Sequence, residues 1–508
     1  MNIKEAKTEI INTVRAYLMR DETGAYRIPI EKQRPLLLIG PPGIGKTAIM
    51  EQAAQELGIN LVAYTITHHT RQSAIGLPYI SKKSFGGKEY SVTEYTMSEI
   101  IAAMYEQVEK SGIQEGILFL DEINCVSETL APTMLQFLQY KSFGSHRIPE
   151  GFVIVAAGNP PEYNKSVRDF DIVTLDRVRR MDIQENFSVW KEYAYRAGVH
   201  GAILAYLDIK KENFYSIHQE LGGKSFVTAR GWEDLSRILK LYEEMELPVT
   251  KALVQEYLEE PEIARDFAAY YELYQKYRQI YRIPEILDGQ FPEDTVSLLQ
   301  APFDEKLSLL GLLVDALNQE FRDYAESLSV QRKLFGELKA LKEALDAAAE
   351  TETSKTAAVL LDASRKQGIE KLERDHEAQL LSREEEKYTR KMLALLESLA
   401  DALKERGSQG AEADYAYIRE WFRTREEMRK QAIADTGKHL SHALQFVSQS
   451  FGEGQELVIF LSELSAGYYS LKFVTECGNE DYYHFNRFLL LRDKRSALQQ
   501  QAAEMLAL

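Results

Sequence analysis

A glycine-rich segment near the N-terminus carries the residue types that bind phosphate. It reads Gly40-Pro41-Pro42-Gly43-Ile44-Gly45-Lys46-Thr47 and fits the pattern G-x-x-x-x-G-K-[ST]. Glycines let the backbone wrap closely, so that successive N–H groups point at the phosphates. Lys46 can reach the β- and γ-phosphates, and the hydroxyl of Thr47 can hold a magnesium ion. The pattern therefore predicts a nucleoside triphosphate site.

The segments on either side of this loop fit the same prediction. The apolar run 36–39 predicts a buried parallel strand, and residues 46–57 predict a helix that Gly58 ends. The N-terminus of such a helix adds a partial positive charge beside a bound phosphate.

Two acidic residues follow the apolar run 117–120, which predicts a central strand. Ligands of doubly wound sheets bind at the carboxyl ends of such strands. Asp121 can position magnesium there, and Glu122 can accept a proton from an attacking water. The alternative is a strand-end turn with two solvated acids. The pair lies ~70 residues after the phosphate loop, within one α/β domain's usual extent.

A small amide follows another apolar run, 152–157. Asn159 could orient the attacking water and sense the γ-phosphate at the same sheet edge. The alternative is a simple Gly-Asn-Pro turn.

Strand and helix patterns alternate over residues 1–186. Predicted strands at 36–39, 61–66, 117–120 and 152–157 are separated by predicted helices at 46–57, 97–110 and 130–140. This order predicts an α/β core, a parallel sheet flanked by helices. Residues 67–94 read as an insertion with a small hairpin.

The strand signal disappears from about residue 187. We expect an all-α lid at 187–280 and a helical C-terminal region at 281–508, with a helical bundle at 411–505. Two long charged helices are expected within 309–405, at 309–345 and 366–405, joined by a polar turn at Thr351–Ser354. Apolar residues recur at 4-3-4 spacing in both, at Leu334, Leu338, Leu341 and Leu345, and at Met392, Leu396, Leu399 and Leu403. A coiled-coil hairpin and a plain helical bundle both fit this spacing.

Charge and composition exclude several classes of protein. The net charge is −17, and residues 1–190 contribute only 20 basic against 23 acidic side chains, so the excess lies beyond them. A nucleic-acid binder usually shows a basic stripe, so nucleic acid is not an expected partner. The apolar runs are too short to span a bilayer, and two cysteines make no disulfide framework. We expect a cytoplasmic protein.

The phosphate loop, the acidic pair Asp121-Glu122 and Asn159, in this order and spacing, resemble the AAA+ ATPases. Leu175-Asp176-Arg177 resembles the segment that ends their α/β core and supplies an arginine finger. Phe226–Glu233 resembles the start of the lid helix that carries the sensor-2 arginine, here Arg230.

Within that family the chain most resembles the MoxR group. The residues that carry this likeness are Gly158-Asn159-Pro160-Pro161 followed by Leu175-Asp176-Arg177, and the insertion around Gly76-Leu77-Pro78. Val178 stands where members often have Phe, and Ala229 where Pro often precedes the arginine; neither change removes a charged group.

The resemblance implies ATP hydrolysis with ATP and Mg²⁺ as ligands. Lys46 and the loop amides would hold the phosphates, Thr47 and Asp121 the magnesium, and Arg230 would contact the γ-phosphate in its own subunit. Arg177 would act on the neighbouring subunit, and Arg179 and Arg180 are alternatives for that role. If Arg177 has only a structural role, it would form a salt bridge with Asp176 or Asp182. A homo-oligomeric ring, by the family's habit a hexamer, follows.

Three functions remain open on this basis. The first is a MoxR-type remodeller or maturation factor for a protein client, with a von Willebrand factor A domain protein as partner. The second is an AAA+ nucleic-acid motor or loader, against which the net charge argues. The third is a nucleotide-switched scaffold, against which Glu122 argues. Phe143, in the loop before the Asn159 strand, is a candidate substrate contact, or a loop aromatic packed on the core.

Overall fold

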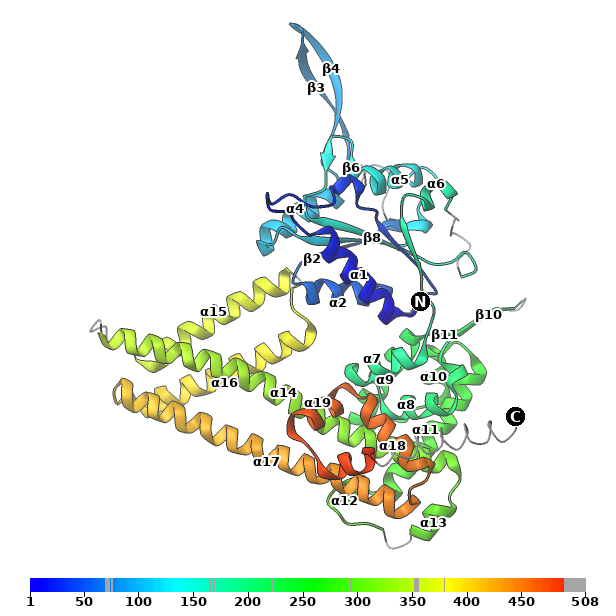
Figure 1. Cartoon of the computed structure of the whole chain (residues 1–508), viewed down its shortest axis with the longest axis vertical. Coiled ribbons are helices and arrows are strands. Elements are labelled where there is room, and N and C mark those ends of the chain that lie inside the picture. The colour runs from blue at the N-terminus through cyan, green and yellow to red at the C-terminus, as the bar shows by residue number, and fades with distance from the viewer. Residues whose placement is uncertain are drawn as a thin grey trace, which may run out of the picture. The chain divides into compact units, whose positions relative to one another are not determined.

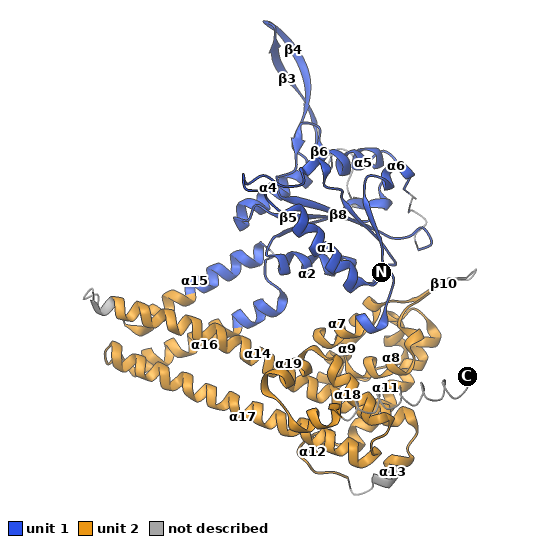
Figure 2. Cartoon of the chain, viewed as in Figure 1, with its two compact units in different colours: residues 1–189, 366–390 blue, residues 190–365, 391–508 orange. Residues whose placement is uncertain are grey.

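The computed structural model describes most of the chain. The described residues are all except 69–73, 75, 164–166, 168–169, 221–222, 293–294, 351–355, 379 and 488–508. They form two compact units (Figure 2). Unit 1 contains Met1–Val189 and Lys366–Arg390, and unit 2 contains Trp190–Arg365 and Lys391–Leu508.

A five-stranded parallel sheet is the centre of unit 1, which confirms the predicted fold class. Its order is β2-β5-β8-β1-β9, and its strands are β1 (Leu36–Ile39), β2 (Asn60–Thr65), β5 (Gly116–Asp121), β8 (Phe152–Gly158) and β9 (Arg179–Asp182). The flanking helices in Figure 1 are α1 (Ile3–Tyr17), α2 (Lys46–Leu57), α4 (Glu99–Ser111), α5 (Ala131–Tyr140) and the short α6 (Ile172–Leu175). Because helices cover the sheet, its central strands are continuous apolar runs, as parallel sheets require.

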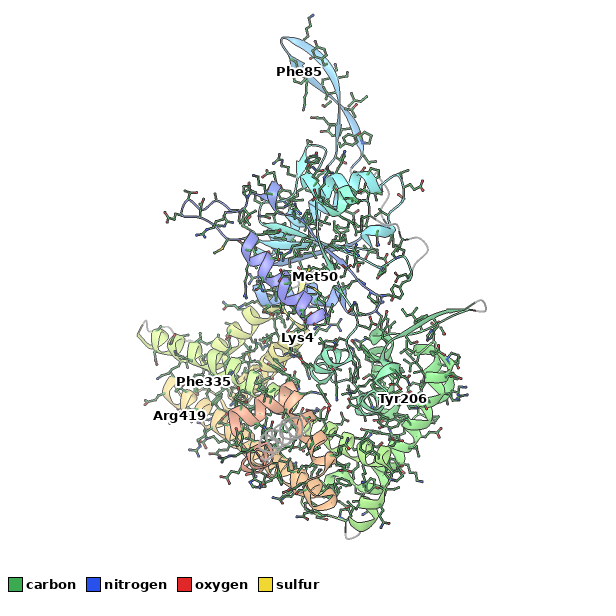
Figure 3. All side chains as sticks on the ribbon, turned by 45° about the vertical axis from the view of Figure 1, so that its right-hand side comes forward. Lys4, Met50, Phe85, Tyr206, Phe335 and Arg419 are labelled. Carbon is green, nitrogen blue, oxygen red and sulfur yellow. The ribbon has the colours of Figure 1, made fainter. Side chains whose placement is uncertain are left out.

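Two β-hairpins extend unit 1. The longer one, β3 (Pro78–Phe85) with β4 (Lys88–Tyr95), projects away from the sheet (Figure 1). Phe85 near its tip is 58% exposed, whereas Met50 of α2 is fully enclosed (Figure 3). The shorter one joins β6 (Ser142–Phe143) to β7 (His146–Arg147). Phe143 is 2% exposed and stacks on Phe137 with ring centroids 4.1 Å apart, so the substrate-contact hypothesis for Phe143 is wrong.

A helical segment far along the sequence, residues 366–390, also belongs to unit 1 (Figure 2). Residues 366–390 form the end of α15 (Ala357–Glu377) and the start of α16 (Arg383–Arg406). Gln107 of α4 donates to the carbonyl oxygen of Ala378 at 2.5 Å, and Gln55 of α2 donates to that of Leu381 at 3.3 Å. Ala378 is completely buried. The predicted continuous helix 366–405 is therefore wrong: the helix is interrupted between Glu377 and Arg383, where backbone carbonyls bond to the α/β core instead.

The lid region is mostly helical. Its helices are α7 (Phe187–Ala197), α8 (Gly201–Ile209), α9 (Ala229–Glu244), α10 (Lys251–Tyr257) and α11 (Pro261–Tyr281), followed by α12 (Ile283–Leu287) and α13 (Thr295–Gln300). It is not all-α, because β10 (Ser216–Glu220) and β11 (Gly223–Val227) pair as an antiparallel hairpin. This hairpin was missed because its sequence is polar and rich in glycine.

Long helices dominate the C-terminal region, as predicted. After α14 (Phe303–Glu350), α15 and α16 come α17 (Ala411–Phe451), α18 (Gln455–Ala466) and α19 (Tyr468–Cys477). All eight residues of the two predicted apolar stripes are buried. α14 packs on α17, where the rings of Phe335 and Phe422 lie 5.9 Å apart. The coiled-coil interpretation stays a prediction, and the turn at Thr351–Ser354 lies outside the described residues.

Among the described residues, no one helix has both the length and the apolar character needed to cross a membrane. The helices α18 and α19 meet those criteria only as a pair, across a bend of 85°.

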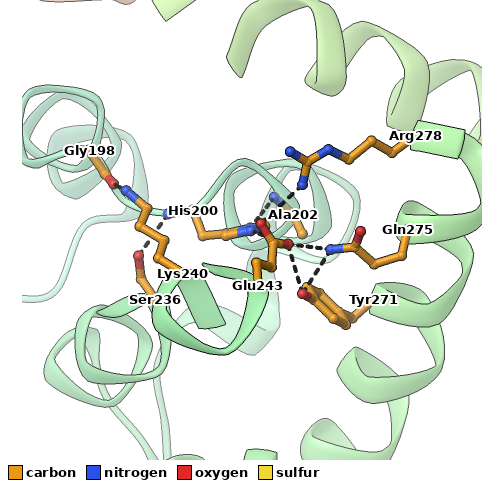
Figure 4. Close-up of polar contacts among 9 residues, drawn as sticks. All are labelled: Gly198, His200, Ala202, Ser236, Lys240, Glu243, Tyr271, Gln275 and Arg278. Carbon is orange, nitrogen blue, oxygen red and sulfur yellow. Dashed lines mark hydrogen bonds and ion pairs between the residues drawn. The ribbon is translucent and has the colours of Figure 1, made fainter. Parts of the chain in front are cut away.

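A half-buried carboxylate ties three lid helices together (Figure 4). Glu243 of α9 accepts hydrogen bonds from Tyr271 at 2.8 Å and Arg278 at 3.0 Å, both on α11, and from Gln275. His200 caps α8: its Nδ1 accepts from the Ala202 N–H, so Nε2 carries the proton and donates to Glu243 at 3.0 Å. Burial raises the pKa of Glu243, but the hydrogen bonds and positive charge around it outweigh burial and lower the pKa to about 2.

We predict that Glu243→Gln lowers the unfolding free energy of unit 2 by about 2 to 3 kcal/mol at pH 7. The folded-state pKa lies below the unfolded value, so this stabilisation is complete above about pH 4.5 and declines as the pH falls toward 2. All three tryptophans lie in unit 2, so urea unfolding followed by tryptophan fluorescence reports on it.

The matched control is Glu244→Gln, which changes the exposed neighbour on the same helix. The difference between wild type and Glu243→Gln should be constant from pH 8 to 5 and narrow below pH 4.5. An equal loss in the control, or a difference that persists unchanged to pH 3, would contradict the role of Glu243.

Candidate nucleotide-binding site

Strand pairing brings the predicted site residues to one edge of the sheet. β1 pairs Ile39 with Gly158 of β8, and β2 pairs Thr65 with Asp121 of β5. Since all five strands are parallel, the residues that follow them meet at their common carboxyl edge. The phosphate loop, the acidic pair and Asn159 are therefore neighbours, although they span 120 residues of sequence from 40 to 159.

The loop between β1 and α2 has the geometry that its glycines allow. Gly45 caps α2 with φ of 93°, a left-handed conformation that suits glycine. α2 then begins at Lys46, so its first backbone N–H groups have no partner within the helix and are available to an anion.

Lys46 is 8% exposed and its ammonium is held at the carboxyl edge. Nζ donates to the carbonyl oxygens of Gly40 at 2.7 Å and Pro41 at 2.8 Å. It also donates to Oδ1 of Asn159 at 2.8 Å. The structure thus joins two predicted residues, one from the phosphate loop and one from the end of β8, by a direct hydrogen bond.

Thr47 and Asp121 supply a pair of oxygen donors. The Thr47 hydroxyl donates to Oδ2 of Asp121 at 3.0 Å, and Oδ1 of Asp121 accepts from the Glu122 N–H at 2.9 Å. Mg²⁺ prefers oxygen ligands and is usually held by one or two protein groups together with phosphates and water. The donor set fits magnesium.

Glu122 is held in an unusual backbone conformation directly after β5. Its φ is 56°, in the left-handed region that costs a non-glycine residue on the order of 1–3 kcal/mol. Its Oε2 accepts a hydrogen bond from the Thr67 hydroxyl at 3.0 Å. Thr67 was not predicted as a site residue, although its place just after the predicted strand 61–66 was a signal for it.

The three candidate arginines have different surroundings. Arg179 donates to the Thr13 hydroxyl of α1 at 2.7 Å and pairs with Glu9. Arg180 pairs with Asp182 at 2.7 Å. Arg177 is exposed in the turn after α6, and its guanidinium forms no hydrogen bond or ion pair with the part of the chain that the structure describes. The salt bridge considered for Arg177 is thus not formed there.

Arg230 lies at the start of α9, which Thr228 caps by accepting from the Gly231 N–H. Its side chain is exposed, and it belongs to unit 2. Its predicted contact with a γ-phosphate stays a prediction.

Comparison with known proteins fits this geometry. The family model for the AAA domain of the dynein-related subfamily matches residues 35–178. Protein SAV from Sulfolobus acidocaldarius is 29% identical over 126 residues, which are 25% of this chain and 13% of that protein. A crystal structure of a Cytophaga hutchinsonii protein described as a candidate ATPase shares 15% identity over 49% of this chain and 84% of that one, and its TM-score of 0.22 carries no inference.

The family match covers the phosphate loop, the acidic pair, Asn159 and Arg177. Over residues 35–178 the chain is therefore similar to the AAA domain of the dynein-related subfamily, which implies nucleotide binding.

Proposed function

We propose that this protein is a Mg²⁺-dependent ATPase of the MoxR type that works as a ring. The observation that carries the proposal is the cluster at the carboxyl edge of the sheet. There Lys46 bonds to Asn159, and Thr47 bonds to Asp121, which also accepts from the backbone N–H of Glu122. Phosphoryl transfer needs little beyond such positioning and charge stabilisation.

Lys46 is suited to receive phosphate. Three of its hydrogen-bond acceptors are neutral: the backbone carbonyls of Gly40 and Pro41 and the amide oxygen of Asn159. An anionic phosphate oxygen adds the attraction of opposite charges to the hydrogen bond, so it would compete with these neutral acceptors for the ammonium. Asn159 would then be released from Lys46 to orient the attacking water.

Glu122 would take the proton from that water. The bond from Thr67 holds Oε2 of this carboxylate, and Oε1 would accept the proton. Magnesium, held by Thr47 and Asp121, would neutralise charge on the transferred phosphate.

Exposed Arg177 supports a ring. Arg179 and Arg180 have ion-pair partners within their own unit, whereas Arg177 is oriented to solvent from the end of the AAA domain. In an assembled ring, by the family's habit a hexamer, Arg177 would complete the neighbour's site. Arg230 would couple the lid to the nucleotide.

A protein client fits the surface better than nucleic acid does. The β3–β4 hairpin exposes Tyr79, Ile80, Phe85 and Tyr90, and such apolar side chains favour polypeptide contacts. The net charge of −17 opposes binding to a polyanion. The client and the von Willebrand factor A domain partner are proposed from the MoxR resemblance.

We predict that Thr47→Val abolishes the gain in ATP affinity that Mg²⁺ provides, because it removes one of the two oxygen donors. Binding of a fluorescent ATP analogue, measured with Mg²⁺ and with EDTA, checks this. Thr8→Val, on the exposed face of α1, is the control and should keep the Mg²⁺ effect. A Thr47→Val protein that still binds more tightly with Mg²⁺ would remove Thr47 from the metal site.

Glu122→Gln should trap ATP with little hydrolysis, because an amide cannot take the proton from water. We expect turnover to fall about 10² to 10⁴-fold while ATP affinity stays within a few-fold. Phosphate release and equilibrium binding measure the two quantities, and Glu109→Gln on the exposed face of α4 is the control. Unchanged turnover would exclude Glu122 as the base.

Affinity capture with Glu122→Gln in ATP should retain the client.

Arg177→Ala should lower hydrolysis by roughly 10³ or more, because an arginine finger contributes about 10³–10⁵ in rate. Mixing it with Lys46→Ala subunits should restore activity, since each Lys46→Ala subunit offers an intact Arg177 to its neighbour. ATPase assays on mixed rings, with mixing confirmed by native mass spectrometry, test this. No restoration would exclude Arg177, and the same experiment with Arg179→Ala and Arg180→Ala would then locate the finger.

A further inference from the structure

Asn124 lies between Glu122 and Asn159, and it has no role in the proposed reaction. It is the middle residue of a short 3-10 helix, Ile123–Cys125, that begins directly after Glu122. The side chain is 5% exposed. Its Nδ2 donates to the backbone carbonyl oxygen of Asn159 at 2.7 Å. This bond joins the chain after β5 to the chain after β8.

The Asn124 side chain packs directly against Gly158, the last residue of β8. A Cβ added to Gly158 would lie 2.4 Å from Oδ1 of Asn124, closer than atoms can approach. The Asn124 side chain thus occupies the space that any larger residue at 158 would need. Only the amide orientation with Nδ2 toward Asn159 makes the bond, because two oxygens would repel.

Asn124 acts on a residue that is itself bonded to Lys46. Asn159 accepts from Asn124 through its backbone and from Lys46 through its side chain. A continuous path of hydrogen bonds therefore runs from the segment after Glu122, through Asn159, to the phosphate-binding lysine. Because Asn124 binds the backbone of Asn159 and Lys46 binds its side chain, the bond from Asn124 does not require the bond to Lys46.

We infer that Asn124 is a positioning residue for γ-phosphate recognition: it fixes the backbone of Asn159 relative to Glu122, so that the water-orienting amide and the base stay in register. This inference rests on the proposed ATPase function. Asn124 would act through Asn159, whose carbonyl oxygen it binds.

Asn124→Asp is the sharpest test, because it keeps the size of the side chain and replaces the donor with an acceptor. We expect kcat for ATP to fall about ten-fold or more, the effect of losing roughly one hydrogen bond, while KM stays within about two-fold. Asn124→Ala, which removes the donor without adding charge, should show the same split between kcat and KM.

The chain offers a matched control in Asn60. It is also buried, and its Nδ2 also donates to a backbone carbonyl oxygen, that of Ile113, at 2.7 Å. It lies at the amino end of β2, opposite the nucleotide edge. Asn60→Asp makes the same chemical change away from the site and should leave kcat within about two-fold. Equal losses of kcat in Asn60→Asp and Asn124→Asp, or a wild-type kcat in both Asn124 variants, would overturn the inference.

A binding experiment separates failure of the inference from failure of the proposed function. The ratio of ATPγS to ADP affinity should fall in Asn124→Asp and Asn124→Ala and stay unchanged in Asn60→Asp. A wild-type protein that binds nucleotide without turnover refutes the ATPase proposal, yet a selective fall in this ratio would still support Asn124. Ratios equal to wild type in the Asn124 variants overturn its role, and absence of nucleotide binding by wild type overturns both.

Discussion

The parallel register of five strands is the constraint on which the nucleotide site depends. A shift of one residue between neighbouring strands would turn each side chain to the opposite face of the sheet. The bond between Thr47 and Asp121 and the bond between Lys46 and Asn159 would both be lost. Dense apolar packing of β1, β5 and β8 between helices holds that register. The apolar core therefore also fixes the site, because the register that packs the buried strands is the one that brings the polar residues after them together.

This dependence explains how much of the site could be predicted from the sequence. Each site residue follows an apolar run, and the rule that parallel strands share a carboxyl edge is enough to bring Lys46, Asp121 and Asn159 together. β9 was missed for the complementary reason. Its residues Arg179–Asp182 contain no apolar run, and only Met181 is buried. It is a strand because β1 offers it an unpaired edge, which is a tertiary fact.

Thr67 and Asn124 show a second limit to predicting the site from the sequence. Thr67 bonds to a side chain 55 residues away, and Asn124 bonds to the backbone of Asn159. Every residue has a backbone carbonyl, so a partner of that kind cannot be inferred from residue types.

The same limit applies to the interruption between α15 and α16. Gln107 and Gln55 bond there to carbonyls of Ala378 and Leu381, which lie beyond the last helical turn and lack helical partners. The apolar stripes identified which faces are buried, but not the α/β core as a partner of residues 366–390.

Arg177, Arg179 and Arg180 show how strand geometry gives different surroundings to residues that look equivalent in sequence. Alternate residues of a strand share a face, so Arg180 meets Asp182, two positions on, and pairs with it. Arg179 faces the other way, toward α1, where Thr13 and Glu9 bind it. Arg179 thereby fastens β9 to α1, whereas the Arg180–Asp182 pair lies within β9 itself. Arg177 precedes the strand, so neither face of β9 supplies it with a neighbour. The nearest effect of its charge is local: hydrogen bonds from Thr174 and the positive charge of Arg177 lower the pKa of the Asp171 carboxyl.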